Sequence, residues 1–168
     1  MNTRDAHPEP IATIDELCTV LATTNHALKI EELRGLASRL RLPALQWRKY
    51  LTFGLRQFSY RTIYESSCFE VNIIGWRSGQ FSSIHDHQGS ACCVLVLDGV
   101  FTNIDYVFDT PDALRGTRKA DLGVGEIQCR SDGEIHRCGN AQSGETKLAT
   151  LHLYSPPLQP LAVRQRHE

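Results

Sequence analysis

From Gly54 onward, the sequence consists of short segments rich in Val, Ile, Tyr, Phe and Thr, separated by Gly, Asp, Asn and Ser. These segments are YRTIYES, CFEVNIIGW, CCVLVLDG, VFTNIDYVF, EIQCRSDG and KLATLHLYS. β-Branched and aromatic residues favour extended chain, and the residues between the segments favour turns. Regularly spaced short strands are typical of sandwiches and barrels, so residues 54–168 are predicted to form a β-sandwich or a β-barrel.

Residues 1–53 have a helical pattern instead. Thr13 and Glu16 fit a capping box, in which two side chains satisfy free amides at the start of a helix. The segment HALKIEELRGLASRLRL carries leucines at helical spacing on one face, and Pro43 suits the start of a further helix. We expect about three helices packed outside the barrel. No repeat or long linker divides the chain, so residues 1–168 are predicted to be one mainly β domain.

The composition is that of an ordinary globular protein. Of 168 residues, 41% are hydrophobic and 22% are charged, and the net charge is −1. Nucleic acid and acidic membrane surfaces normally require clustered positive charge, so neither is expected as a partner. No apolar run approaches the roughly 20 residues of a membrane span, and MNTRDAHPEP lacks the apolar core of a secretory signal. We therefore expect a cytoplasmic protein, and we expect it to be a monomer.

The cysteines form no CxxC pair. The six are Cys18, Cys68, Cys92, Cys93, Cys129 and Cys138. Without an export signal, a disulfide framework is not expected. Free cysteine often behaves as a small buried hydrophobic residue, and we assign that role to most of these six.

Three histidines lie at two distinctive spacings. Between Gly79 and Gly99 the order is Gly-x5-His85-x-His87-x4-Cys-x6-Gly, and a second segment from Gly125 reads Gly-x5-Ser-Asp-Gly-x2-His136-x3-Asn. Residues i and i+2 of a strand point to the same face, so His85 and His87 can both enter a barrel interior. Imidazoles suit Zn, Cu, Fe and Ni, and a third histidine from a facing strand would complete a metal site with an open face. A lone HxH is more often two surface histidines; the joint spacing, glycines included, favours the metal site.

The two spacings resemble the two motifs of the cupin superfamily. Cys92 stands where most cupins have a metal-binding Glu, and Ser131 replaces the usual Pro. A cysteine at this position is typical of the cysteine dioxygenase family. The segments SSIHDHQGSAC and LHLYSPP resemble the hallmark segments of that family. The similarity runs from roughly Tyr60 to Pro157. It implies a cupin-type β-barrel, also described as a small double-stranded β-helix.

The resemblance also implies a reaction. His85, His87 and His136 would bind one Fe(II), and the enzyme would oxidise L-cysteine with O2 to cysteine sulfinate. The alternatives are a dioxygenase for 3-mercaptopropionate or another small thiol, and a non-catalytic cupin that senses a metal or ligand. Relatives that act on 3-mercaptopropionate commonly have Gln and Gly at the positions of Arg61 and Cys92, so these two residues favour cysteine.

Further roles are implied for five residues near the expected iron. Arg61 matches the arginine that binds the substrate carboxylate, which a guanidinium can hold bidentately. Tyr154 matches a tyrosine whose hydroxyl lies over the iron, and His152 orients that hydroxyl. Thr150 matches a residue that supports the histidine. Trp76 matches a tryptophan that forms an apolar wall of the site.

The resemblance implies one covalent bond and one unusual peptide bond. Cys92 matches the cysteine that forms a thioether with the tyrosine, here Tyr154. Simple alternation from His87 would instead point Cys93 inward, while the spacing to the following glycine favours Cys92. The family's bond at Ser155–Pro156 is commonly cis, which predicts a cis peptide here.

Overall fold

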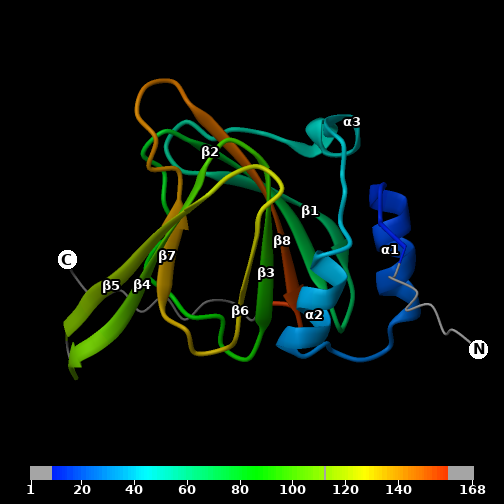
Figure 1. Cartoon of the computed structure of the whole chain (residues 1–168), viewed down its shortest axis with the longest axis horizontal. Helices are drawn as coiled ribbons and strands as arrows, with labels where there is room; N and C mark the ends of the chain where they lie inside the picture. The colour runs from blue at the N-terminus through cyan, green and yellow to red at the C-terminus, as the bar shows by residue number, and fades with distance from the viewer. Residues whose placement is uncertain (1–8, 112, 159–168) are drawn as a thin grey trace, which may run out of the picture.

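Figure 1 presents the computed structural model of the chain, in which residues 9–111 and 113–158 are described. The helices are α1 (Ile14–Thr23), α2 (Ile30–Ala37) and α3 (Ala44–Trp47), followed by a 3-10 turn, η1 (Arg48–Tyr50). The strands are β1 (Ser59–Glu65), β2 (Glu70–Arg77), β3 (Ala91–Asp98), β4 (Phe101–Thr110), β5 (Ala113–Leu122), β6 (Ile127–Arg130), β7 (His136–Gly139) and β8 (Lys147–Ser155). Residues 1–8 lie outside the described residues. They make up most of the segment MNTRDAHPEP, which was predicted not to be a secretory signal.

The helices form where the sequence predicted them. At the start of α1, the amide of Glu16 donates to the Thr13 hydroxyl at 3.1 Å, and the Glu16 carboxylate accepts from the Thr13 amide at 3.2 Å. This pair is the predicted capping box, and it satisfies two free amides of the helix end. Leu17 of α1 and Leu33 of α2 are fully buried. No helix in the described part of the chain is long and apolar enough to cross a membrane.

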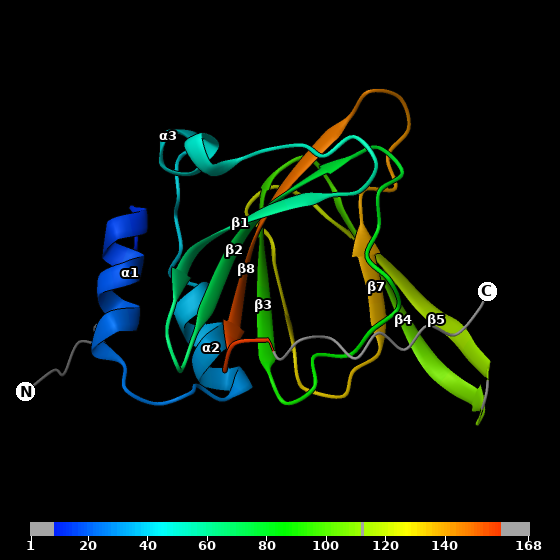
Figure 2. The ribbon, with the colours of Figure 1, turned by 180° about the vertical axis from the view of Figure 1, so that it is seen from behind.

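The strands form two antiparallel sheets that face each other (Figures 1 and 2). One sheet has the order β1-β2-β8-β3-β6, and the other has the order β5-β4-β7. The prediction of a mainly β, cupin-type double-stranded β-helix fold with outer helices is confirmed, and the two sheets do not close into a complete barrel. A complete barrel needs continuous strand pairing at both places where the edges of the two sheets meet. In the described residues, the segment between β2 and β3 makes only the isolated bridges Phe81↔Gly139 and His85↔His136 with the smaller sheet.

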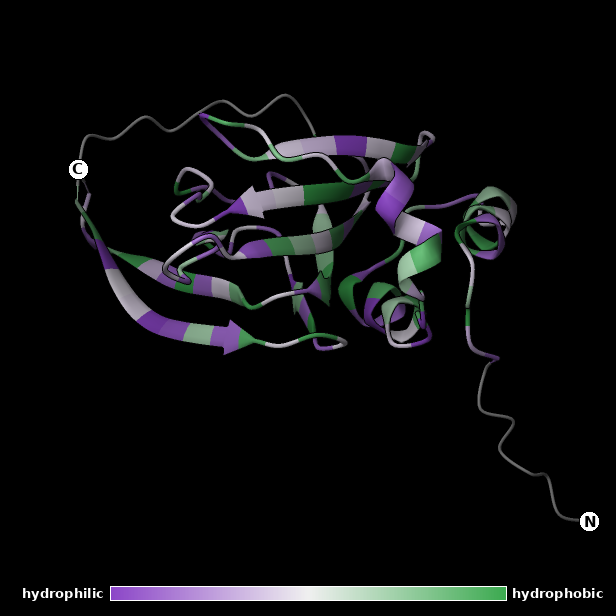
Figure 3. Cartoon of the chain, turned by 90° about the horizontal axis from the view of Figure 1, so that it is seen from above, coloured by the Kyte–Doolittle hydropathy of each residue, from purple (hydrophilic) through white to green (hydrophobic). Residues whose placement is uncertain are grey.

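The helices cover the outer face of the five-stranded sheet. Seen from above, the helices lie together beside the strands, with hydrophobic residues in both (Figure 3). Among the side chains of this core are Leu17, Leu33, Leu36, Val71, Ile73, Leu95, Leu151 and Leu153. Their burial fixes which face of the sheet points outward, so the opposite face points toward the smaller sheet.

The inner face is revealed by alternation along the central strand β8. Ala149, Leu151 and Leu153 belong to the outer core, whereas His152 and Tyr154 line the space between the sheets. Strands β2 and β3 alternate in the same way, and each is buried on both faces along most of its length. Polar side chains buried on the inner face of these strands therefore surround an internal site.

One disulfide lies on the outer face of the five-stranded sheet. Cys93 of β3 and Cys129 of β6 are direct cross-strand neighbours with their Cα atoms 4.1 Å apart, and their sulfur atoms are bonded. The expectation of no disulfide is therefore wrong for this pair. The two cysteines are 36 positions apart in the sequence, and only the antiparallel register brings them together, so no local pattern indicated this pairing. The Ser155–Pro156 peptide is cis, as predicted.

Candidate metal centre

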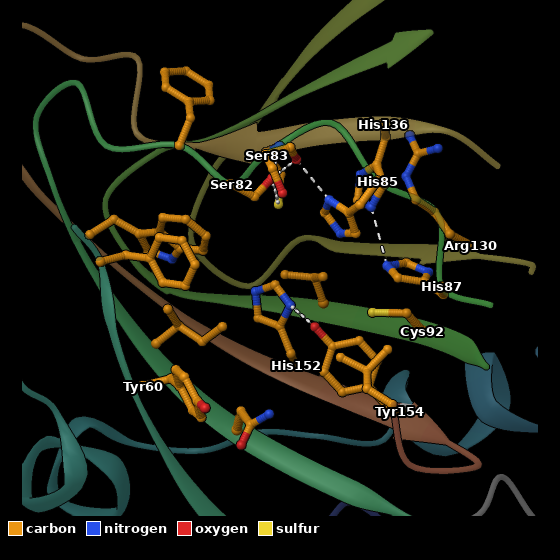
Figure 4. Close-up of a pocket in the computed structure, with 18 of the residues that line it drawn as sticks. Tyr60, Ser82, Ser83, His85, His87, Cys92, Arg130, His136, His152 and Tyr154 are labelled. Carbon is orange, nitrogen blue, oxygen red and sulfur yellow. Dashed lines mark hydrogen bonds between the residues drawn. The ribbon is translucent and has the colours of Figure 1, made fainter. Parts of the chain in front are cut away.

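A cavity of about 570 Å³ lies between the two sheets (Figure 4). Its floor is built from two rows of residues that are paired across β2, β8, β3 and β6. The first row is Glu70, Tyr154, Cys92 and Arg130, and the second is Asn72, His152, Val94 and Gln128. Paired residues on one face of a sheet have neighbouring side chains, so each row brings sequence-distant groups together.

His85, His87 and His136 converge at the side of the cavity (Figure 4). Their ligand nitrogens all lie within 4.8 Å of one another, and the Nε2 atoms of His87 and His136 are 3.2 Å apart. The predicted regular strand through His85 and His87 is absent, because residues 82–90 are irregular apart from the bridge at His85. Two backbone hydrogen bonds of 2.9 Å between His85 and His136 align the segment instead.

Two of the three imidazoles are oriented by hydrogen bonds. His85 Nδ1–H donates to the carbonyl oxygen of Ser83 at 2.8 Å, and His136 Nδ1–H donates to Asn103 Oδ1 at 2.7 Å. Each bond fixes the tautomer, so that Nε2 keeps its lone pair for a metal. Asn103, on β4, was missed by the sequence analysis, since no local spacing links it to His136.

The site keeps its imidazoles neutral. Burial, followed by the charges of His85 and Arg130, lowers the pKa of His87 to about 3. Burial is also the first cause of the lowered pKa of His136 and of His85. Neutral imidazole is the form that binds a metal, and three nitrogen donors suit Zn, Cu, Fe or Ni. The residues present therefore fit a transition metal held by three histidines.

A chain of hydrogen bonds leads from Trp76 to Tyr154. Trp76 Nε1–H donates to Thr150 Oγ1 at 2.9 Å, Thr150 Oγ1 lies 3.0 Å from His152 Nε2, and His152 Nδ1 lies 3.0 Å from the Tyr154 hydroxyl. If the Thr150 hydroxyl donates to Nε2, then Nδ1–H donates to Tyr154, and the phenol proton is left to donate into the cavity. Burial lowers the pKa of His152 to about 3, which keeps this imidazole neutral.

Cys92 and Tyr154 are cross-strand neighbours in the cavity. Burial raises the pKa of both groups, and a hydrogen bond between the thiol and the phenol contributes to each pKa. Both groups therefore carry their protons near neutral pH. Cys93 points to the opposite face, where it is bonded to Cys129, so the adjacent cysteine is not beside Tyr154.

The structure does not bring Arg61 to the cavity. Arg61 is paired with Ile73 of the outer core and is exposed, whereas its neighbour Tyr60 is paired with Ile74 and lines the cavity. In this placement Arg61 does not line the cavity, so the structure gives no support to its predicted role in binding a substrate carboxylate. The sequence match did not determine the strand register, and a shift of one residue moves a side chain to the other face of a sheet.

Arg130 is a cavity residue that the sequence analysis missed. It is 8% exposed, and it forms an ion pair with Asp105 of β4. Asp105 also accepts a hydrogen bond of 2.7 Å from Asn103 Nδ2, the same amide that orients His136. Alternation from Cys129 along β6 could have suggested that Arg130 faces inward, but the position of β6 in the sheet could not be read from the sequence.

Similar solved structures define the class of fold. The chain superposes on the TT1209 protein from Thermus thermophilus with a TM-score of 0.55 at 16% identity, covering 65% of this chain and 92% of that one. For a double-stranded β-helix protein from Klebsiella pneumoniae, the TM-score is 0.52 at 16% identity, with coverage of 65% and 80%. A cupin superfamily protein from Desulfitobacterium hafniense gives 0.50 at 15%, with coverage of 64% and 84%. These likenesses show a cupin-type, double-stranded β-helix fold, and in this chain three histidines that could hold a metal converge within it.

The sequence comparisons identify the family within that class. The family described as cysteine dioxygenase type I matches residues 3–166, so the chain belongs to this family of oxidoreductases. Among its relatives, cysteine dioxygenase type 1 of Danio rerio is 29% identical over 140 residues, covering 79% of this chain and 68% of that protein. The protein of the same name from Rattus norvegicus is 28% identical over 136 residues, covering 77% and 66%. The chain thus spans about two thirds of the length of these relatives.

Proposed function

We propose that this chain is a non-haem iron thiol dioxygenase that converts L-cysteine and O2 to cysteine sulfinate. In this reaction the thiol R–SH and O2 give the sulfinic acid R–SO2H, so both oxygen atoms are incorporated. The observation that carries the proposal is the convergence of three neutral imidazoles in one cavity with Tyr154 and its His152 partner. The family name supports cysteine as the substrate.

His85, His87 and His136 would hold the Fe(II). Iron bound by three neutral ligands keeps its full dipositive charge, which favours the thiolate form of the substrate and its reaction with O2. The cavity would hold the thiol beside the metal and so convert a chance encounter into a reaction within one complex. Tyr154, whose hydroxyl lies 3.0 Å from His152 Nδ1, would donate a hydrogen bond toward the reacting atoms.

A related thiol such as 3-mercaptopropionate is the second candidate substrate. One specific observation favours it: Arg61, one of the two residues that predicted cysteine, does not line the cavity. A non-catalytic sensing cupin is less well supported. Such a protein needs a metal or ligand site, but it has no need of the hydrogen-bonded series that ends at the Tyr154 hydroxyl.

The proposal is tested by O2 consumption of the Fe(II)-loaded protein with L-cysteine and with 3-mercaptopropionate. We expect uptake of one O2 per thiol, faster with L-cysteine, and 18O2 should label both oxygens of the sulfinate product. Faster turnover of 3-mercaptopropionate would make it the substrate. Iron-loaded protein that consumes no O2 with either thiol would sink the dioxygenase proposal and support the sensing cupin.

We further propose a thioether between Cys92 and Tyr154. Their direct pairing across β3 and β8 supports it. The sulfur would bond to the phenol ring, with loss of the S–H and one ring hydrogen and transfer of two electrons to O2. After many turnovers, peptide mass mapping should find the two segments joined and lighter by one H2. Two separate, unmodified peptides after sustained turnover would contradict this bond, and so would a bond to Cys93.

A further inference from the structure

Arg130 is the single Lys or Arg side chain among the described residues that line the cavity. The residue is 8% exposed, although arginine is almost never fully buried unless it is paired. The other basic side chains of the cavity wall are four histidines: three converge as candidate metal ligands, and the fourth, His152, is hydrogen-bonded to Tyr154. Arg130 therefore supplies the one guanidinium among the described residues of this cavity.

The register of the sheet puts Arg130 beside the reacting groups. Arg130 of β6 is paired with Cys92 of β3, and Cys92 is paired on its other side with Tyr154 of β8. The three side chains share the inner face, so Arg130 and Tyr154 flank Cys92. Figure 4 shows Arg130 next to His85 and His136, so its guanidinium lies at the edge of the candidate metal site.

Asp105 binds the guanidinium of Arg130 but does not accept hydrogen bonds from all of its N–H groups. Asp105 Oδ1 accepts from Nη2 of Arg130, and no described residue accepts from the buried Nε. A guanidinium has five N–H donors in a planar fork, and buried donors are normally satisfied. Because Asp105 is also bound by Asn103, the same network orients Arg130 and the metal ligand His136. The fork is therefore fixed relative to the metal site and retains donors for a second anion.

We propose that Arg130, rather than Arg61, binds the carboxylate of the substrate and so selects thiols that carry one. The inference rests on the proposed thiol dioxygenase function and specifies its substrate class as thiol carboxylates. A carboxylate held by Arg130 would lie on the Cys92 side of the metal site, close to the Tyr154 hydroxyl. The arginine that binds the carboxylate would then be on β6 rather than on β1, at the opposite edge of the five-stranded sheet.

The test is equilibrium binding to the Fe(II)-loaded protein without O2, so that ligand binding is measured apart from turnover. Isothermal titration calorimetry compares L-cysteine with cysteamine, which has the thiol and amine but no carboxylate. We expect Arg130→Gln to weaken L-cysteine binding by about 30-fold or more and to leave cysteamine within about threefold of wild type. Arg61→Gln is the matched control on the exposed face, and it should bind both ligands as wild type does.

Two further variants separate recognition from folding. Arg130→Gln leaves Asp105 unpaired, so the double variant Arg130→Gln/Asp105→Asn removes both charges and should show the same selective loss. Arg130→Lys keeps the charge without the fork and should recover part of the L-cysteine affinity. Equal loss for both ligands would overturn the proposal, as would selective loss in Arg61→Gln or equal binding of both ligands by wild type. If wild type binds L-cysteine selectively through Arg130 but consumes no O2, the proposed function fails and this inference stands.

Discussion

Replacing His136 with alanine is expected to remove Fe(II) and thiol oxidation together. His136 supplies one of three converging nitrogens, and its Nδ1 is fixed by Asn103. Loss of a partner that merely orients a ligand typically weakens metal affinity 10- to 100-fold, so loss of the ligand itself should weaken it by more than about 100-fold. Iron content after dialysis and O2 uptake with L-cysteine measure the two effects on the same sample.

The matched control is His26→Ala, because the His26 side chain is 62% exposed and lies outside the cavity. This variant should retain wild-type iron content and activity. The backbone hydrogen bonds between residues 136 and 85 survive in His136→Ala, so its fold should be kept. Full iron content in His136→Ala would contradict the assignment of this histidine as a ligand.

Tyr154→Phe is expected to lower kcat by about 100-fold or more while iron content stays at the wild-type level. The substitution removes the cavity hydroxyl that lies 3.0 Å from His152 Nδ1. The ring remains, so the apolar packing of the cavity wall is preserved. Single-turnover O2 uptake, with iron measured in parallel, distinguishes lost chemistry from lost metal.

Tyr64→Phe is the control for this substitution, since Tyr64 packs against the outer core. It should leave kcat unchanged. A Tyr154→Phe enzyme with wild-type kcat would show that the hydroxyl takes no part in the reaction. A loss of iron in the same variant would instead assign Tyr154 to the structure of the metal site.

Local patterns in the sequence were enough for part of this structure. The capping box at Thr13 depends on residues three apart, and the i, i+2 relation of His152 and Tyr154 depends on one strand. The spacing around His85 and His87 identified two of the converging imidazoles even though the segment is not a regular strand. In each case the information lies within a few residues of the feature.

The missed features all depend on strand pairing. If the pairing of β1 with β2 shifts by one residue, Arg61 and Tyr60 point to opposite faces of the sheet from before. Similarity in sequence could therefore not decide which of the two lines the cavity. Arg130 acquires its position from pairing with Cys92, and the Cys93–Cys129 bond depends on the same two strands. Non-local register is set by the packing of whole faces, which no short motif encodes.

The incomplete seam between the two sheets has a consequence for stability. At this seam the described backbone contributes isolated bridges, and the three imidazoles lie across it: His136 begins β7 of the smaller sheet, while His85 and His87 come from the segment that joins β2 to β3. Coordination of a metal there would act as a cross-link between the sheets. Part of the free energy of metal binding would then be folding free energy, so we expect thermal denaturation and metal release to form one coupled equilibrium.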